Sequence, residues 1–395
     1  MQRKLQISPS KELLMPINVP QKLLMGPGPS NAPPRILAAG ALPMLGHMHP
    51  EFVKVMDDVK AGIQYAFQTR NELTLAVSGT GHAGMEAATM NILEPGDTIL
   101  VAEKGLWGKR LADLGNRNGA NVKIIKKPMG QVFSLLEIEN GLRRYNPSVF
   151  FITQGESSGT ALQPLEGVGE LCHRYNCLLF VDTVASLGGV PLLVDEWGID
   201  VIYSGSQKVL GAPPGTAPIS FSMKAREKMA RRKTRVPSFY LDMVELGNYW
   251  GCDESPRRYH HTGMIHSVYA LREGLAMLAE EGLENCWVRH RQCAEMLWAG
   301  LEKLGLKLLV TDRSARLPTV TGVMVPQGVA WKEVTQYMMD KYKIEISGGL
   351  GALAGKIWRI GLLGHNCQPY NVEKVLIALK EALSHCGMQI PASKL

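Results

Sequence analysis

Short apolar runs alternate with helical patterns between about residues 70 and 220, and this alternation restricts the fold more than any other feature of the chain. Each run has the length of a strand and few polar residues, which is typical of strands buried on both faces. Strands that alternate with helices form a mainly parallel sheet with helices on both sides. The sequence predicts an α/β domain with strands in LTLAVSG, DTILVAEKG, NVKIIKKP, SVFFITQG, CLLFVDTV and DVIYSGSQ, and with helices in HAGMEAATMNILEP and LEGVGELCHRYN.

After about residue 265 the pattern becomes helical over a long span, and a few short strands follow. We expect one long helix within 267–305 that joins two domains. The predicted strands KLLVT, TVTGVMVP and IEISGGL, with helices between and after them, indicate a smaller α+β domain. The prolines in SPSKELLMPINVP indicate an extended arm before the first domain. The expected division is an N-terminal arm at 1–22, a large domain at 23–283 and a small domain at 284–395.

Composition excludes several classes of partner. Hydrophobic residues make up 45% of the 395 residues and charged residues 20%, which is ordinary for a globular protein. The net charge is +7 and the basic residues are scattered, so we expect no nucleic acid and no membrane among the partners. No apolar run is long enough to span a bilayer. The seven cysteines are odd in number and follow no signal-peptide pattern, which favours free thiols in a reducing compartment.

The segment SGTGHAGMEAA places a glycine-rich turn between a predicted strand and a predicted helix. Gly79, Gly81 and Gly84 satisfy the pattern G-x-G-x-x-G, and Glu103 ends the next strand. This nearly completes the dinucleotide-binding fingerprint and allows a nicotinamide-dependent dehydrogenase. Glycine also lets the backbone approach an anion, and the first N–H groups of a helix bind phosphate, so any phosphorylated cofactor fits as well. Tight turns use glycine without a ligand too.

Asp182 stands at the carboxyl end of the apolar strand in LLFVDTVASLGG. Open α/β sheets bind ligands at the carboxyl ends of their strands, and an aspartate is rarely buried without a partner. Two readings follow from this segment alone. The carboxylate either caps the next helix or pairs with a protonated nitrogen of a ligand.

Lys208 follows the next predicted strand, in YSGSQKVLGAPPG, one strand–helix–strand unit after Asp182. We therefore expect its strand end and that of Asp182 to share one sheet edge with the glycine turn. A phosphate-binding turn, a carboxylate and a lysine together match the needs of pyridoxal phosphate. The lysine forms a Schiff base, the acid pairs with the pyridinium nitrogen and the helix N-terminus holds the phosphate. A dehydrogenase has no use for this aspartate and this lysine.

Several stretches carry a family resemblance that extends from about residue 5 to the C-terminal end. They resemble the peroxisomal alanine–glyoxylate (serine–pyruvate) aminotransferases, a group of class-V pyridoxal-phosphate-dependent aminotransferases. The resemblance implies fold type I of these enzymes, with a mainly parallel large domain and a smaller α+β C-terminal domain, and a homodimer with shared active sites. The stretches are LLMGPGPSN, SGTGHAGMEA, GLWGKR, TQGESSG, VDTVASLGG, YSGSQKVLGAPPG, NYWGCDE, PRRYHHT and WRIGLLG.

The resemblance also implies roles for individual residues. Lys208 matches the Schiff-base lysine and Asp182 the partner of the pyridine nitrogen. Arg359 matches the residue that binds the substrate carboxylate, which suits the bidentate fork of a guanidinium. The other implied contacts are stacking on the cofactor ring by Trp107, cofactor contacts by Gly81, His82, Ser157 and Gln207, phosphate contacts by Tyr259 and Thr262 of the other subunit, and a substrate contact at Gly28.

The reaction that the resemblance implies is transfer of the amino group of L-alanine to glyoxylate, giving pyruvate and glycine. Serine–pyruvate transamination is expected as a second activity. The related insect 3-hydroxykynurenine transaminases carry an Asn-Phe pair near the substrate, where this chain has His47 and Met48. Two stretches depart from the family pattern: ESSGTAL has a changed order after the two serines, and GLGALAGK lacks a proline. Both bear on substrate preference rather than on reaction type.

The last three residues are Ser393, Lys394 and Leu395. A terminal S-K-L is an address that a peroxisomal import receptor reads. We therefore expect a peroxisomal location and the import receptor as a partner.

Other readings of the motifs remain as alternatives. A cysteine desulfurase of the same fold would need a catalytic cysteine on a mobile loop, and Cys367 is the only candidate near Arg359. Cys172 and Cys177 lie near a histidine, but no second ligand pair follows at zinc spacing. His260 and His261 are adjacent in sequence, and we expect packing or interface roles for them, because adjacent residues rarely point the same way. No metal is expected.

Overall fold

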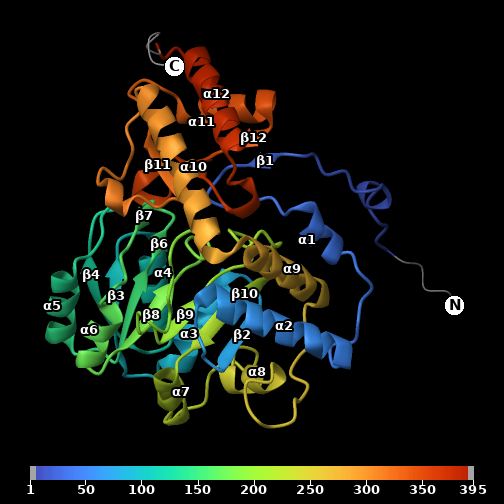
Figure 1. Ribbon diagram of the computed structural model, residues 1–395, viewed down its shortest axis with the longest axis vertical. Helices are drawn as coiled ribbons and strands as arrows, with labels where there is room; N and C mark the ends of the chain where they lie inside the picture. The colour runs from blue at the N-terminus through green and yellow to red at the C-terminus, as the bar shows by residue number, and fades with distance from the viewer. Residues whose placement is uncertain (1–5, 390–395) are drawn as a thin grey trace.

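The computed structural model describes residues 6–389, and a seven-stranded sheet forms the centre of its larger part (Figure 1). The strand order is β2-β10-β9-β8-β5-β3-β4. Neighbouring strands from β9 to β4 pair in parallel, while β10 pairs antiparallel with both neighbours. The mainly parallel sheet is thus confirmed. Its strands are β2 (Leu73–Ser78), β3 (Thr98–Glu103), β4 (Asn121–Lys126), β5 (Val149–Thr153), β8 (Leu178–Asp182), β9 (Val201–Tyr203) and β10 (Thr216–Phe221).

The strand β10 was not among the sequence predictions. Its segment TAPISF contains Pro218 and small residues, which lower strand propensity. Burial overrides that preference, because every residue of β10 is buried between β2 and β9. The carbonyl oxygen of Pro218 still accepts a hydrogen bond, from the N–H of Ser204 at 2.8 Å.

Helices cover both faces of the sheet. The helices α3 and α4 contact each other, and α5 contacts α6. The crossovers through α3 and α4 run toward β4 along the sheet, and those through α5 and α6 run back toward β8. Right-handed crossovers in opposite directions place their helices on opposite faces, so the two pairs of helices cover opposite faces. The helices of this part are α1 (Pro34–Ala39), α2 (Pro50–Phe67), α3 (Gly81–Ile92), α4 (Leu106–Arg117), α5 (Leu135–Tyr145), α6 (Val168–Arg174), α7 (Met223–Ala230), α8 (Met243–Tyr249) and α9 (Ile265–Glu281).

The expected long helix is two helices. Gly282, with a φ of 84°, separates α9 from α10 (Leu283–Lys303). A positive φ does not fit an α-helix, and glycine adopts it without steric cost. The helix α10 then leads into the C-terminal elements, drawn in orange and red above the sheet in Figure 1.

The C-terminal elements build a second hydrophobic core around an antiparallel sheet in the order β11-β14-β13. The predicted strand KLLVT forms only an isolated bridge between Leu308 and Val323, and IEISGGL is divided into two short strands. The elements are β11 (Val320–Met324), β12 (Ile344–Glu345), β13 (Ser347–Gly348), β14 (Ile357–Gly361), α11 (Trp331–Tyr337), α12 (Pro369–His385) and a single π-helical turn, η3 (Met338–Tyr342).

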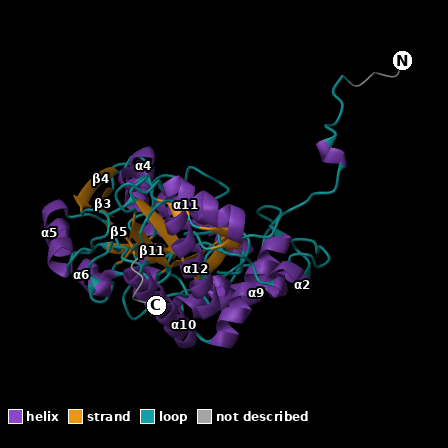
Figure 2. Ribbon diagram, turned by 90° about the horizontal axis from the view of Figure 1, so that it is seen from above, coloured by secondary structure: helices purple, strands orange, loops and turns teal. Residues whose placement is uncertain are grey.

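The N-terminal segment reaches this second core before it enters the first. The strand β1 (Leu23–Leu24) pairs in parallel with β12, and Met25 is buried in the C-terminal core. Residues 6–22 carry one 3-10 turn, η1 (Glu12–Leu14), and extend away from the rest of the chain in Figure 2. Our division into an arm at 1–22 and domains at 23–283 and 284–395 stays a proposal.

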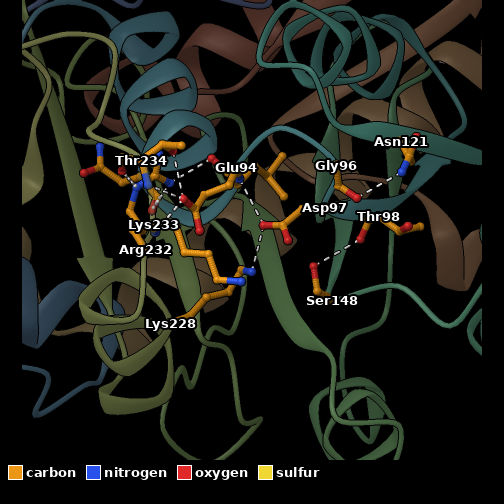
Figure 3. A network of polar contacts seen from close by, with 12 residues as sticks. Glu94, Gly96, Asp97, Thr98, Asn121, Ser148, Lys228, Arg232, Lys233 and Thr234 are labelled. Carbon is orange, nitrogen blue, oxygen red and sulfur yellow. Dashed lines mark hydrogen bonds and ion pairs between the residues drawn. The ribbon is translucent and has the colours of Figure 1, made fainter.

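A polar network closes the amino-terminal edge of the sheet, where β3 begins (Figure 3). Glu94 accepts hydrogen bonds from the backbone of Lys233 and from the backbone and hydroxyl of Thr234. Asp97 accepts from the backbone of Glu94 at 3.0 Å and from Lys228 at 2.8 Å. The charged groups of this edge are thus largely paired with one another. The opposite edge carries the candidate site.

Helix α9 supports the segment that carries Lys208. A Cβ at Gly274 would overlap the carbonyl oxygen of Leu210. Alanine is normally the better helix former by about 1 kcal/mol, yet here overpacking would cost about 1–3 kcal/mol. We predict that Gly274→Ala lowers the free energy of unfolding, measured by urea denaturation.

The matched control is Gly40→Ala, at a φ of −67° with the nearest atom 3.5 Å from the added Cβ. That change should leave stability unaltered or raise it. Equal effects of the two substitutions would contradict the close approach of α9 to Leu210.

Candidate active site

The carboxyl ends of several parallel strands meet at one edge of the sheet, and a cavity opens there. Its walls come from the segments that follow these strands, as the parallel sheet predicts. The cavity brings together the predicted residues Gly81, His82, Trp107, Ser157, Asp182, Gln207 and Lys208, and also Thr80, Met85, Gly155, Val184, Ala185 and Tyr203.

The glycine turn lies at the cavity and opens α3. Thr80 precedes the helix, and Gly81 and His82 form its first positions and line the cavity. The first N–H groups of a helix have no partner within it, so this end suits an anion. A Cβ at Gly84 would lie 3.1 Å from Ala217, so this glycine serves close packing of the helix on the sheet. Glu103 forms an ion pair with a neighbouring strand and does not line the cavity.

Asp182 is 2% exposed and lies on the cavity wall. One carboxylate oxygen accepts a hydrogen bond from the N–H of Val184 at 2.8 Å, and the other accepts from the hydroxyl of Tyr203 at 2.6 Å. Burial raises the pKa of Asp182 to about 6, although the hydrogen bond from Tyr203 acts in the opposite direction. The carboxylate is therefore placed to accept a bond from a cationic group in the cavity.

Lys208 reaches the cavity from the segment after β9 and donates a hydrogen bond to the carbonyl oxygen of Pro27. Gly28 lies directly against it, with a φ of 112°, and a Cβ there would overlap the ammonium group. Burial lowers the pKa of Lys208 to about 8, and the positive charge of Arg359 lowers it further. The amine is thus more easily deprotonated than an ordinary lysine.

Trp107 and Ser157 line the cavity and are hydrogen-bonded to each other. The indole N–H of Trp107 donates to the hydroxyl of Ser157 at 2.9 Å. The ring of His82 meets the indole edge-on at a centroid distance of 5.6 Å, and its Nε2 lies 2.9 Å from Arg110. These contacts fix the plane of the indole at the cavity.

Arg359 lies in β14 and does not itself line the cavity, but it bonds to the backbone of Ser157, which does. Its Nε donates to the carbonyl oxygen of Gly348 at 2.9 Å, and its Nη1 donates to that of Ser157 at 3.3 Å. The residue is 5% exposed, and burial lowers the pKa of its guanidinium. A buried cation held beside the Ser157 backbone suits a small carboxylate ligand.

Tyr259 and Thr262 do not lie at the cavity of their own chain. Both side chains are exposed, and that of Tyr259 is 60% exposed. The ring centroids of Tyr259 and His47 lie 4.9 Å apart. His260 and His261 do point toward each other, with their Nδ1 atoms 2.8 Å apart. Adjacent side chains point to opposite sides in a strand, but this segment is a loop, so that expectation does not apply to it.

Sequence reasoning missed several buried polar residues at the site. Tyr203 lies opposite Asp182 in the parallel pairing of β8 and β9. The two predicted strands therefore already indicated that Tyr203 ends its strand beside Asp182. Lys104 and Glu156 lie just after predicted strands and are almost completely buried. A charged residue at the carboxyl end of an apolar strand was the signal that identified Asp182, and it applied to these two as well.

Two of the alternative interpretations can be compared with residues 6–389. No cluster of three or more histidine, cysteine or acidic residues there could hold a metal ion. The cysteines are free, and Cys367 is completely buried and does not line the cavity. No helix in that range combines the length and the apolar character needed to cross a membrane.

Pyridoxal phosphate fits the residues of this cavity. The cofactor needs an anion site, a carboxylate for its ring nitrogen, an aromatic wall and an amine. The cavity offers the start of α3, Asp182, Trp107 and Lys208 in these capacities. The side-chain oxygen of Gln207 is buried without a partner within the described residues, and a ligand group would satisfy it.

Comparison with known families and proteins agrees with this chemistry. Residues 28–368 match the family model described as aminotransferase class-V. The chain is 56% identical over 383 residues to an alanine–glyoxylate aminotransferase of Callithrix jacchus, which covers 97% of this chain and 92% of that protein. It is 47% identical to one of Drosophila melanogaster, over 99% of this chain and 100% of the other.

A solved structure shares the fold over nearly the full length. The crystal structure of an alanine–glyoxylate aminotransferase from Nostoc sp. superposes with a TM-score of 0.92. The two chains are 48% identical, and the match covers 95% of this chain and 100% of that one. The expected fold type I is thereby confirmed.

The burial of Asp182 should reduce the stability of the cofactor-free protein. Its pKa is about 6 in the folded state and about 3.9 in an unfolded chain. The folded state then binds more protons between these values, so stability falls as the pH rises through this window and stays lower above it. We predict that Asp182→Asn stabilises the cofactor-free protein at pH 7 by up to about 3 kcal/mol.

Urea unfolding of both cofactor-free proteins near pH 4 and near pH 7 measures the difference. The gain should shrink at the lower pH, where the aspartate is protonated in the folded state and about half protonated in the unfolded chain. An equal difference at both pH values would contradict the raised pKa.

Proposed function

The chain belongs to the class-V aminotransferase family, and we propose that it transfers the amino group of L-alanine to glyoxylate, giving pyruvate and glycine. Class-V aminotransferases use pyridoxal phosphate, with an amino acid and a keto acid as substrates. The observation that carries the proposal is the identity of 53–56% to mammalian alanine–glyoxylate aminotransferases over nearly the whole chain. We propose serine–pyruvate transamination as a second activity.

The residues of the cavity would hold the cofactor as follows. Lys208 would bind it covalently through Nζ, and Asp182 would keep a proton on the ring nitrogen. The start of α3, with Gly81 and His82, would bind the phosphate. Trp107 would stack on the ring, and Ser157 and Gln207 would hydrogen-bond the polar edge. When bound, the cofactor supplies a ring that accepts the electron pair left at the α-carbon of the amino acid.

Arg359 would bind the substrate carboxylate and thereby orient the α-carbon toward Lys208. Its Nη1 already faces the backbone of Ser157, at the cavity wall. Lys208 Nζ would then take the proton from the α-carbon, for which a lowered pKa is an advantage. Gly28 lies directly against Lys208, where any side chain would collide with the ammonium group, and we propose it as a substrate contact. The two departures from the family pattern, at 156–162 and 349–356, contribute only Ser157 to the cavity wall.

We propose a homodimer with shared active sites. Tyr259 and Thr262 are exposed and lie away from the cavity of their own chain, which suits residues that complete the cofactor site of a partner. The arm at 6–22 supports this, because it extends into solvent with exposed apolar side chains, among them Ile17 at 90%. Packing against a second copy would bury these side chains.

A peroxisomal location is part of the proposal. It rests on Ser393, Lys394 and Leu395, which lie outside the described residues. A receptor reads such a tripeptide as an address. Import of the full-length protein compared with a variant that lacks the tripeptide tests it.

Lys208→Ala should abolish the proposed reaction. The substitution removes the amine that would both hold the cofactor and carry the proton, so turnover of L-alanine with glyoxylate should fall by about 10³-fold or more. A coupled assay for pyruvate measures this. Lys224→Ala, which removes an exposed lysine, is the matched control. Near-normal turnover of Lys208→Ala would refute the proposed role of this residue.

Arg359→Lys should separate charge from geometry at the carboxylate site. Lysine keeps the positive charge but loses the two-pronged fork, so the KM for L-alanine should rise by about 10- to 100-fold. Cofactor affinity and melting temperature serve as controls, because Arg359 also bonds to Gly348 and Ser157. An unchanged KM in a folded, cofactor-bound variant would exclude Arg359 as the carboxylate ligand.

A further inference from the structure

Lys104 is a second lysine near the site and is buried more deeply than Lys208. Neither the glycine turn nor Lys208 accounts for it. Its side chain is 1% exposed and lies at the carboxyl end of β3. Its ammonium group has no hydrogen-bond partner within residues 6–389. An isolated buried charge is costly, so a lysine in this position calls for a nearby negative charge.

Glu156 provides one such charge, from the short strand β6 (Gly155–Glu156). It is 1% exposed, and a Cβ at Gly105 would overlap its carboxylate, so the backbone next to Lys104 packs directly on it. Its Oε1 accepts from the N–H of Ser158 at 3.1 Å and from the hydroxyl of Ser158 at 2.5 Å. Its Oε2 has no partner among the described residues.

Glu156 also lies beneath the segment that carries the aromatic wall. The N–H of Leu106 donates to the hydroxyl of Ser158 at 2.9 Å, and that hydroxyl in turn donates to the Glu156 carboxylate. Ser157, which directly follows Glu156 in the chain, accepts a hydrogen bond from the indole N–H of Trp107. Through Ser158, the carboxylate therefore supports the backbone next to both partners of the Trp107–Ser157 contact.

We propose that Lys104 and Glu156 act together as two opposite buried charges behind the cavity that position Trp107 and act on the carboxylate of Asp182. Lys104 follows β3 directly, Glu156 lies three residues after β5, and Asp182 ends β8, and these three strands are parallel neighbours. Lys104 and Glu156 are positioning residues, since neither lines the cavity. The proposal rests on the role proposed above for Asp182 at the cofactor ring. The proposal goes beyond the role of Asp182 because it assigns a function to Lys104 and Glu156, which do not line the cavity.

The ionisation of these groups agrees with a coupled pair. Burial lowers the pKa of Lys104 to about 8, while the charges of Glu156 and Asp182 raise it. Burial raises the pKa of Glu156, against the hydrogen bond from Ser158 and the charge of Lys104. The other charged or titratable groups that interact with Glu156 or Asp182 are Tyr203, Lys208 and Arg359.

The two members of the pair act on Asp182 with opposite sign. The Lys104 cation favours the ionised form of Asp182, and the Glu156 anion opposes it. Removing Lys104 should therefore raise the pH at which Asp182 ionises, and removing Glu156 should lower it. Loss of packing alone would produce no such opposite shifts.

The test compares Lys104→Met, Glu156→Gln and the double variant with the wild type. Each cofactor-free protein is titrated with pyridoxal phosphate between about pH 5 and about pH 8, across the ionisation of Asp182. The cofactor's own ionisation is common to all of them, and Asp182→Asn identifies the part of the profile that belongs to this residue. Lys109→Met, on the exposed face of the same segment, is the matched control.

We expect Lys104→Met to move the acid limb of the binding profile to higher pH by about half a unit or more, and Glu156→Gln to move it to lower pH. The double variant should return close to the wild-type profile. The proposal would be overturned if the acid limb of the binding profile stayed at the wild-type pH in both single variants. It would also be overturned if the limb moved in the same direction in both. Loss of turnover in Lys208→Ala is independent of these results, so failure of the pair and failure of the proposed function can be told apart.

Thermal unfolding provides a second measurement in case a single variant folds poorly. Each single variant leaves one buried charge without its partner, whereas the double variant removes both. The double variant should melt above both single variants. A melting temperature of the double variant below both would overturn the proposal.

Discussion

The carboxylate of Asp182 lies at a sheet edge almost without contact to water, held by one backbone N–H and one tyrosine hydroxyl. Two donors do not compensate fully for the lost hydration, and the pKa of this group stays raised at about 6. A cationic ring nitrogen in the cavity would complete the compensation. The site is thus prepared for its cofactor by an interaction that is unfavourable without it.

The positive charges of the site follow the same logic. Arg359 is buried and Lys208 half-buried, and the charge of Arg359 disfavours the charge on Lys208. The start of α3 adds a partial positive charge. Few acidic groups offset them within the cavity wall. A cofactor phosphate and a substrate carboxylate would supply the missing negative charge. The fold therefore selects for anionic ligands, because these cations bond to backbone carbonyl oxygens and form no ion pair among the described residues.

The sequence allowed much of this site to be predicted, because parallel strands bring their carboxyl ends to one edge whatever the detailed packing. Asp182 and Lys208 were found from strand ends alone, and the family resemblance supplied Trp107 and Arg359. The strand β10 was missed, because Pro218 and small residues hide a strand that burial enforces. Lys104 and Glu156 carried the same strand-end signal as Asp182 and were overlooked, and the packing of Gly105 on the Glu156 carboxylate is not visible in the sequence. Tyr259 and Thr262 lie away from the cavity of one chain, so their proposed role involves a second copy.

The central claim is that Lys208 carries a cofactor which exchanges an amino group between L-alanine and glyoxylate. The visible absorption spectrum of the purified protein tests it most directly. The account predicts a band of the lysine-bound cofactor that fades on addition of L-alanine and returns on addition of glyoxylate. A protein that shows no band even after addition of pyridoxal phosphate, or a band that neither substrate changes, would contradict it.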